Sequence, residues 1–189
     1  MRVVLTGGPH AGKSTLLSEL AARGVRTVGE AALSEIEQLV ARYGPAEART
    51  RRRADMRSFQ IAVSKRQAEA EAELVGYDGL VVFDRGVHDG VAYCTHHGFA
   101  VPEEVARIAD QTHYDLCVVC ELVLPFEARS STGRTSDEAS ARRLESLVAD
   151  TYRARGIPVL RLPMAPIDRR ADALLSMTHV ETVAAVAAR

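Results

Sequence analysis

One stretch near the start of the chain decides its fold: Gly7-Gly8-Pro9-His10-Ala11-Gly12-Lys13-Ser14, which follows the apolar run Val3-Val4-Leu5-Thr6. It fits the pattern G-x-x-x-x-G-K-[S/T] of a phosphate-binding loop, or P-loop. The glycines let the backbone turn so that successive N–H groups point inward around a phosphate. Leu16, Leu17 and Leu20 follow at helical spacing, so the positive end of a helix faces the anion. The stretch therefore predicts a strand, a nucleotide-binding loop and a helix.

The residues of this loop have distinct expected roles. Lys13 is expected to reach the outer phosphates and to neutralise charge on the transferred group. The Ser14 hydroxyl is expected to coordinate Mg²⁺. The predicted nucleotide-binding residues run through the loop into the helix: Gly8, Pro9, His10, Ala11, Gly12, Lys13, Ser14 and Thr15.

The bulk composition is that of an ordinary globular chain. Its 189 residues fit one domain with a hydrophobic core, and a formal net charge of −1 favours neither nucleic acid nor an anionic membrane. The first residues enter a strand directly and no apolar run approaches membrane-spanning length, so neither a signal peptide nor a membrane span is predicted. Three cysteines without a disulfide framework are typical of a reducing compartment, so we expect a cytoplasmic protein.

Short apolar runs alternate with longer helical patterns along the chain, which favours βαβ units on a parallel sheet with helices on both faces. Five strands are expected, at about residues 2–6, 25–28, 80–83, 116–123 and 158–162. Helices are expected at about residues 12–23, 30–43, 47–75 and 138–155, near Val87, and from 168 onward. No repeat or interdomain linker is visible, so residues 1–189 are predicted to form a single domain.

A second constellation, Phe83-Asp84-Arg85-Gly86, lies where an apolar strand ends. Ligands bind at that edge in open α/β sheets. Asp84 matches the acidic position that holds Mg²⁺ in P-loop proteins, although it could instead cap the helix that begins near Val87. Arg85 could clamp a phosphate or a substrate oxygen with its planar guanidinium group, or form an ordinary surface ion pair.

Two further carboxylates are candidates for the acceptor side of such a site. Glu30 follows the second strand and could orient, or take a proton from, an attacking hydroxyl. It could equally be a glutamate in the first turn of a helix, stabilised by the helix dipole. Asp89 lies four residues beyond Arg85, and the sequence favours an ordinary exposed acid on a helix for it.

The segment at about residues 125–137 is rich in Ser, Thr, Gly and Arg, which is typical of a closing lid. Kinases need such a lid to exclude water and to stabilise charge on the moving phosphoryl group. Arg129 is expected to contact the nucleotide and Arg134 to act in catalysis. Arg142 and Arg143 are within reach of the same role.

Two other patterns are interpreted more plainly. Cys117 and Cys120 are three residues apart on a strand and point to opposite faces, so they cannot share a metal ion. A cluster of arginines is either a solvated helix face or a gate for an anionic acceptor. Its members are Arg49, Arg51, Arg52, Arg53 and Arg57.

Together these motifs resemble a known family. The resemblance is carried by residues 6–17, Ala21-Ala22-Arg23-Gly24, Val28-Gly29-Glu30-Ala31-Ala32, Phe83-Asp84-Arg85-Gly86 and Asp89. They resemble the AAA_28-type P-loop ATPase/kinase family, whose relatives include ribosylnicotinamide kinase domains and, more distantly, nucleoside and nucleotide monophosphate kinases. This resemblance implies a three-layer kinase-like fold with strand order 2-3-1-4-5 and Mg-nucleotide at the P-loop. It also implies that Glu30 and the Asp84-Arg85 pair face the acceptor.

We therefore expect a kinase that transfers the γ-phosphoryl group of Mg-ATP to the hydroxyl of a small molecule, nucleoside-like or otherwise. The predicted catalytic residues are Lys13, Glu30, Asp84, Arg85 and Arg134, and Ser14 with Asp84 would hold Mg²⁺.

The alternative is a nucleotide-dependent regulatory switch. The chain contains no Asn, so it has no Asn-Lys-x-Asp element for reading guanine, yet GTP stays open as the nucleotide. The expected partners are a nucleoside triphosphate and a small acceptor, without nucleic acid or membrane. Monomer and homodimer both remain open.

Overall fold

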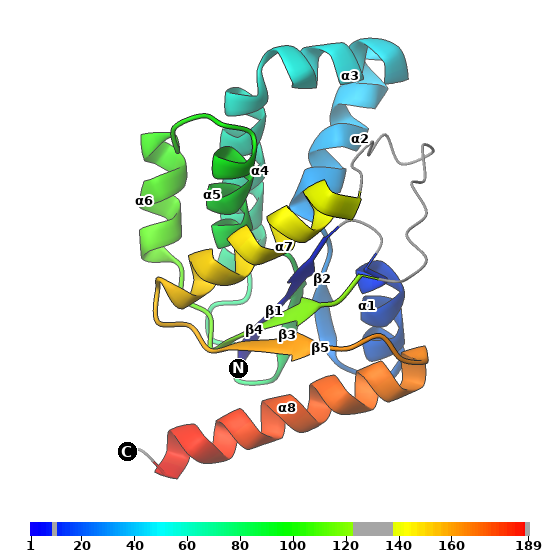
Figure 1. Cartoon of the computed structure of the whole chain (residues 1–189), viewed down its shortest axis with the longest axis vertical. Coiled ribbons are helices and arrows are strands. Elements are labelled where there is room, and N and C mark those ends of the chain that lie inside the picture. Colours follow the sequence, from blue (N-terminus) through cyan, green and yellow to red (C-terminus); the bar gives the residue numbers. More distant parts are fainter. Residues whose placement is uncertain (9–10, 123–137, 188–189) are drawn as a thin grey trace.

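The computed structural model of this chain is built on one five-stranded parallel sheet (Figure 1). The structure describes residues 1–8, 11–122 and 138–187, with side chains up to residue 178. The strands are β1 (Arg2–Gly7), β2 (Arg26–Val28), β3 (Val81–Asp84), β4 (Leu116–Cys120) and β5 (Val159–Leu162). Their order in the sheet is β2-β3-β1-β4-β5, so both the expected fold class and the order implied by the family resemblance are confirmed.

Helices cover both faces of this sheet. They are α1 (Lys13–Ala22), α2 (Ala31–Tyr43), α3 (Pro45–Ala54), α4 (Met56–Ala72), α5 (Val87–His96), α6 (Glu103–Gln111), α7 (Glu138–Arg153) and α8 (Ile167–Ala187). Helices α1 and α8 pack against each other and cover one face, whereas α5 and α7 pair on the other. Within the described part of the chain, no helix combines the length and the apolar character needed to cross a membrane.

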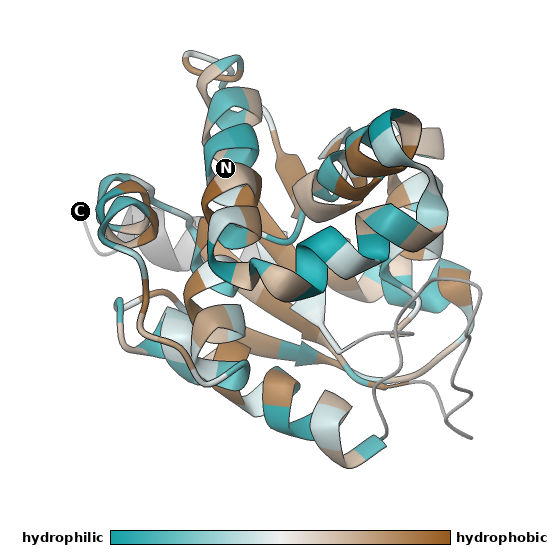
Figure 2. Ribbon diagram, turned by 90° about the horizontal axis from the view of Figure 1, so that it is seen from above, coloured by the Kyte–Doolittle hydropathy of each residue, from teal (hydrophilic) through white to brown (hydrophobic). Residues whose placement is uncertain are grey.

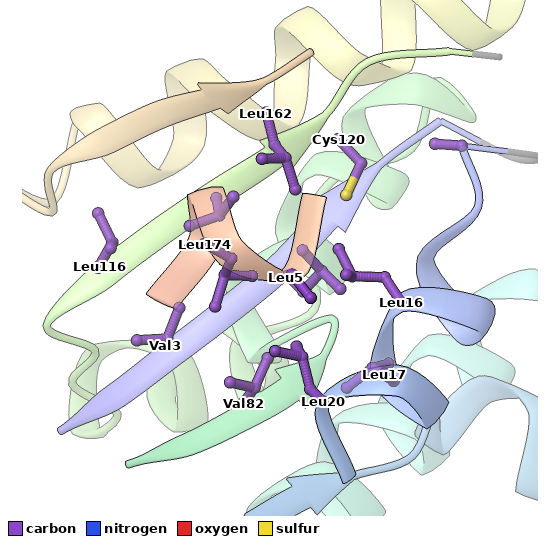
Figure 3. Close-up of a cluster of buried hydrophobic side chains, with 13 residues drawn as sticks. Val3, Leu5, Leu16, Leu17, Leu20, Val82, Leu116, Cys120, Leu162 and Leu174 are labelled. Carbon is purple, nitrogen blue, oxygen red and sulfur yellow. The ribbon is translucent and has the colours of Figure 1, made fainter. Parts of the chain in front are cut away.

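Alternation along the strands sends side chains into two separate cores. On one face, Leu5 of β1 packs with Leu16 of α1 and Leu174 of α8, all fully buried (Figure 3). On the other face, Phe83 of β3 packs with Tyr152 of α7. Figure 2 shows the result, with hydrophobic strands enclosed between helices whose outer surfaces carry the hydrophilic residues. Both faces of a parallel sheet must be covered in this way, because neither can face water.

The two cysteines of β4 confirm this alternation. Cys117 belongs to the core under α5 and α7, and Cys120 to the core under α1 and α8. Both are buried free thiols, and they lie on opposite faces of the sheet as the sequence predicted.

One helical expectation was wrong, and one helix was not expected. The helix expected at about residues 47–75 is broken into α3 and α4 at Asp55, whose backbone leaves the helical region at φ −133° and ψ 69°. The Asp55 carboxylate accepts a hydrogen bond of 2.9 Å from the backbone N–H of Ser58, so it caps the new helix. Helix α6 was not expected at all.

The connection from β2 to β3 carries α2, α3 and α4, which rise from the carboxyl edge of the sheet (Figure 1). Helix α5 leaves the same edge after β3. These four helices therefore stand on the side of the sheet edge where the loop after β1 also lies (Figure 1).

Candidate functional site

The loop between β1 and α1 needs glycine at several positions. Gly7 has φ 133°, and a Cβ there would lie 2.4 Å from the backbone oxygen of Cys120 on β4. Gly12, directly before α1, has φ 73°. A Cβ on Gly8 would lie 2.6 Å from the side chain of Leu122. The loop therefore runs too close to β4 for larger residues, which is the packing that a phosphate-binding loop requires. Pro9 and His10 lie outside the described residues.

Lys13 begins α1 and folds back over the loop. Its side chain is buried, and Nζ donates a hydrogen bond of 2.9 Å to the backbone oxygen of Gly8. Burial and the neighbouring Arg85 cation lower the pKa of Lys13 to about 8. Ser14 and Thr15 follow in the first turn and are exposed. The Lys13 ammonium group thus lies beside the P-loop backbone that would surround a phosphate.

Asp84 ends β3 next to this lysine. It is 3% exposed, and among the residues that the structure describes its Oδ1 atom has no hydrogen-bond partner. Burial raises the pKa of Asp84, an effect that the charge of Lys13 opposes. Asp89, and not Asp84, caps α5: its carboxylate accepts a hydrogen bond of 3.1 Å from the Gly86 N–H. A buried carboxylate oxygen therefore remains available for a ligand beside the P-loop.

Arg85 connects the two sides of the site. Its Nε donates to Glu30 at 3.2 Å, and Nη1 donates to Asp89 at 3.1 Å and to the Gly7 backbone oxygen at 3.3 Å. Burial works against the charge of Arg85, but Tyr93, Glu30 and Asp89 outweigh that effect and hold its pKa above the usual value. The structure thus brings Glu30, Arg85 and the P-loop together, as the sequence predicted.

The expectation that Asp89 is an exposed helix acid is wrong. Its side chain is 2% exposed, and it accepts hydrogen bonds from Thr6, Arg85 and Tyr152, the last at 2.7 Å. Thr6 of β1 and Tyr152 of α7 are far from Asp89 in the sequence, whereas Arg85 lies four residues before it. A local signal existed nonetheless: Asp89 occupies the third position of α5, where an acid caps the helix start.

Glu30 stands at the N-terminal boundary of α2, as the helix-based interpretation of this residue required. Its carboxylate is nevertheless turned to Arg85 and lines a pocket of about 660 Å³. That volume lies within the usual range for small-molecule sites, roughly 300–1,000 Å³. Helices α2, α3, α4, α5 and α7 supply the walls. Glu30 therefore stands at the start of a helix and also lines the pocket.

The basic cluster divides in the structure. Arg52 and Arg53, near the end of α3, line this pocket. Arg51 instead pairs with Glu47 at 2.7 Å one turn earlier on the same helix. Sequence reasoning left the solvated face and the anionic gate open, and the structure places Arg51 in a surface ion pair and Arg52 and Arg53 at the pocket.

Arg170 was not singled out from the sequence, yet it reaches the P-loop. This residue of α8 is 3% exposed, and Nη1 donates a hydrogen bond of 2.8 Å to the backbone oxygen of Ala11. Within the described residues, Nε and Nη2 of Arg170 have no partner. Nothing in the sequence around Arg170 distinguishes it from the other arginines of the chain.

The residues present fit a magnesium ion bound together with a nucleotide. No group of three His, Cys, Asp or Glu side chains in the described part of the chain could hold a metal ion alone. Mg²⁺ in nucleotide sites is bound by few protein oxygens together with phosphate oxygens and water. The buried Oδ1 of Asp84 and the exposed Ser14 hydroxyl suit this chemistry. The predicted lid, with Arg129 and Arg134, lies outside the described residues.

A comparison of the sequence with models of known protein families identifies the family of this chain. A family model described as an AAA domain, AAA_28, matches residues 2–170. The chain belongs to the AAA_28 family. This confirms the resemblance drawn from the P-loop and the Asp84-Arg85 motif. Among curated proteins, no match to the AAA_28 chain was found.

Solved structures share the fold of this AAA_28 protein. A thymidylate kinase from Ehrlichia chaffeensis superimposes with a TM-score of 0.61 and 13% identity, covering 95% of this chain and 98% of its own. A deoxyadenosine kinase from M. mycoides with bound dATP gives a TM-score of 0.64 and 12% identity, covering 95% and 100%. At such identities the likeness establishes the fold, a P-loop kinase fold, and leaves the acceptor open.

Proposed function

We propose that this protein is a kinase that transfers the γ-phosphoryl group of Mg-ATP, or of Mg-GTP, to the hydroxyl of a small molecule. One observation carries the proposal: a pocket of about 660 Å³ opens at Arg85 and Glu30, beside the P-loop. A protein that only binds or hydrolyses a nucleotide has no need of a second pocket at this place. A kinase needs one, because the acceptor must meet the γ-phosphate in line.

The chain's own groups have separate tasks in this proposal. The P-loop N–H groups and Lys13 hold the phosphates, and Lys13 neutralises charge that develops on the transferred group. Glu30 or Asp84 orients the acceptor hydroxyl and takes its proton, while Arg85 fixes the acceptor. Ser14 and Asp84 would hold Mg²⁺, which when bound neutralises charge on the phosphate oxygens.

We further propose that residues 1–189 act as one domain, with a lid at about residues 125–137 that supplies Arg129 to the nucleotide and Arg134 to the reaction. Closing such a lid would keep water from the γ-phosphate. The buried free thiols of Cys94, Cys117 and Cys120 support a reducing, cytoplasmic setting.

Replacing Lys13 by Ala tests the assignment. Loss of its charge should lower the rate of phosphoryl transfer by at least about 100-fold while the fold is retained. The measurement is nucleoside diphosphate release from Mg-ATP and from Mg-GTP, with and without pools of nucleosides, nucleoside monophosphates, sugars and aminoglycoside-like compounds. Lys65→Ala is the matched control, since Lys65 is an exposed lysine that pairs with Glu104.

The outcomes separate the two functions. Release that rises with one acceptor pool, and that requires Lys13, supports a kinase. Slow release that no pool accelerates would favour the regulatory switch instead. A Lys13→Ala protein that keeps most of its turnover would contradict the P-loop assignment.

A further inference from the structure

The acceptor pocket has a closed floor and an open mouth. At the floor, Arg85, Asp89 and Gln60 are each no more than 5% exposed. At the other end, Arg53 and His97 are exposed. The pocket is therefore elongated, and we call it a shaft: its floor, at Arg85, is buried, and its mouth is in contact with water.

Helix α5 gives the length of this shaft. Asp89 lies in its first turn and His97 directly follows its last residue, so the two are eight positions apart. At a rise of about 1.5 Å per residue, floor and mouth are roughly 12 Å apart. Between them the wall carries apolar and aromatic side chains, among them Phe59 of α4 and Tyr93 of α5.

The charges in the shaft are divided between its ends. Among the described residues that line it, the carboxylates are Glu30 and Asp89, and both pair with Arg85 at the floor. The described residues that line the mouth include arginines and histidines and no acid. Arg53 forms no ion pair with any residue that the structure describes, in contrast to Arg51 and its partner Glu47.

Arg52 and His97 lie close together at this mouth, although they come from different helices. Burial lowers the pKa of His97, and the charges of His96 and Arg52 lower it further. The guanidinium carbon of Arg52 also lies 5.7 Å from the centre of the Phe59 ring. Helices α3, α4 and α5 thus converge on one positively charged rim.

From this arrangement we propose that the phosphoryl acceptor carries an anionic group, a carboxylate or a phosphate, bound at the pocket mouth by Arg52 and Arg53. Its reacting hydroxyl lies at the other end of the molecule, next to Arg85. The proposal rests on the kinase function above and adds a substrate class to it. Arginine is suited to this role because its planar fork matches the oxygens of either anion. The positive charge of the rim would also attract the negatively charged acceptor to the pocket mouth.

The test compares three rigid probes of one shape: biphenyl carboxylate, biphenyl phosphonate and the uncharged biphenyl carboxamide. Each is titrated calorimetrically into the full-length protein saturated with Mg-ADP, which keeps the phosphonate out of the P-loop. At least one anionic probe should bind at least about 10-fold more tightly than the carboxamide, and the tighter of the two identifies the anion. An NMR titration of His97 gives a second readout, because a bound anion raises the pKa of that ring and the carboxamide does not.

The double variant R52Q/R53Q should abolish the preference for the anion, and R49Q should retain it. Arg49 is an exposed arginine of the same helix and does not line the pocket. Thermal unfolding of both variants shows that each is folded. Equal affinity for acid and amide, a preference that survives R52Q/R53Q, or no binding of any probe would each overturn the inference.

Failure of the kinase proposal would look different. No acceptor pool would then accelerate nucleoside diphosphate release from Mg-ATP or Mg-GTP, whether or not the anionic probes bind at the pocket mouth. Mg-ADP that failed to bind, or that bound equally well to the Lys13→Ala protein, would contradict the P-loop assignment itself.

Discussion

Arg85 holds its backbone at φ 68°, in the left-handed region that residues other than glycine rarely adopt. Such a conformation costs about 1–2 kcal/mol and persists only when the surroundings impose it. Here they do, because the backbone N–H donates to the Leu5 carbonyl at 3.0 Å while the side chain is held by Glu30 and Asp89. The strain places a buried cation at the junction of the P-loop and the pocket that we propose for the acceptor.

Glu30 and Asp84 should differ in what their loss changes. Glu30 lines the acceptor pocket, so Glu30→Gln should lower kcat with little effect on nucleotide affinity. Asp84 stands beside Lys13 and offers a buried oxygen, so Asp84→Asn should weaken the Mg²⁺-dependent part of nucleotide binding. Nucleotide titrations with and without Mg²⁺, combined with steady-state kinetics, measure both effects. If Glu30→Gln changed only Mg²⁺ dependence, the two roles would be assigned the wrong way round.

Nucleotide binding should be linked to proton uptake above neutral pH. The pKa of Lys13 is lowered to about 8 by burial and by Arg85, and a bound phosphate would raise it again. Below pH 8 the ammonium group is already charged, whereas at pH 9 binding must protonate it, so affinity falls as the pH rises above 8. Calorimetry at pH 9 in buffers of different ionisation enthalpy measures the uptake. The Lys65→Met protein should behave like the wild type, and an absence of uptake at pH 9 would rule out this linkage.

At the scale of elements, the junction between α3 and α4 is decided by one side chain. Without the break at Asp55, α3 would continue into α4, and Arg52 and Arg53 would not be turned toward the pocket that α4 lines. The helical pattern of the sequence is continuous through this point. The non-helical backbone of Asp55 and the hydrogen bond from the Ser58 N–H to its carboxylate show that a new helix starts there.

Asp55→Ala should therefore lower the free energy of unfolding by about 1 kcal/mol, the usual effect of losing a helix cap. Chemical denaturation measures it. Asp78→Ala is a suitable comparison, because Asp78 is an exposed acid in the connection before β3 and its loss should change stability by less than about 0.5 kcal/mol. Equal effects of the two substitutions would show that the cap does not hold the junction.

The sequence predicted the features that depend on neighbouring residues. The P-loop, the end of β3 and the alternation of Cys117 and Cys120 could all be found locally, because backbone turns and strand faces are set within a few positions. Asp89 could not be placed in this way, since Thr6 and Tyr152 bury it from β1 and α7. The acceptor pocket was equally hidden, because its walls come from five helices that meet only in the folded chain.

At the scale of the whole molecule, the C-terminal helix is part of the core. The family match ends at residue 170, yet Ala171 and Leu174 of α8 are fully buried against β1 and α1. Arg170 of the same helix bonds to the backbone of the P-loop. Helix α8 thus links the covering of one sheet face to the position of the nucleotide loop.

Leu174→Ala should lower the free energy of unfolding by about 2–5 kcal/mol, since it leaves a cavity in a close-packed core. Met164→Ala, at a position that is 52% exposed, should change it by less than about 0.5 kcal/mol. Both values come from denaturant unfolding. A Leu174→Ala protein as stable as the wild type would mean that α8 is not docked as described.

The P-loop follows β1, whereas most walls of the proposed acceptor pocket lie in the segment that joins β2 to β3 and in the helix after β3. These are separate pieces of chain, joined at the floor by Arg85. Substitutions within residues 31–72 could therefore change the acceptor during evolution, while the P-loop residues that bind the phosphates stayed the same. A chimera in which this segment comes from another kinase of the same fold should prefer the phosphoryl acceptor of that kinase. It should keep the nucleotide preference of the present chain.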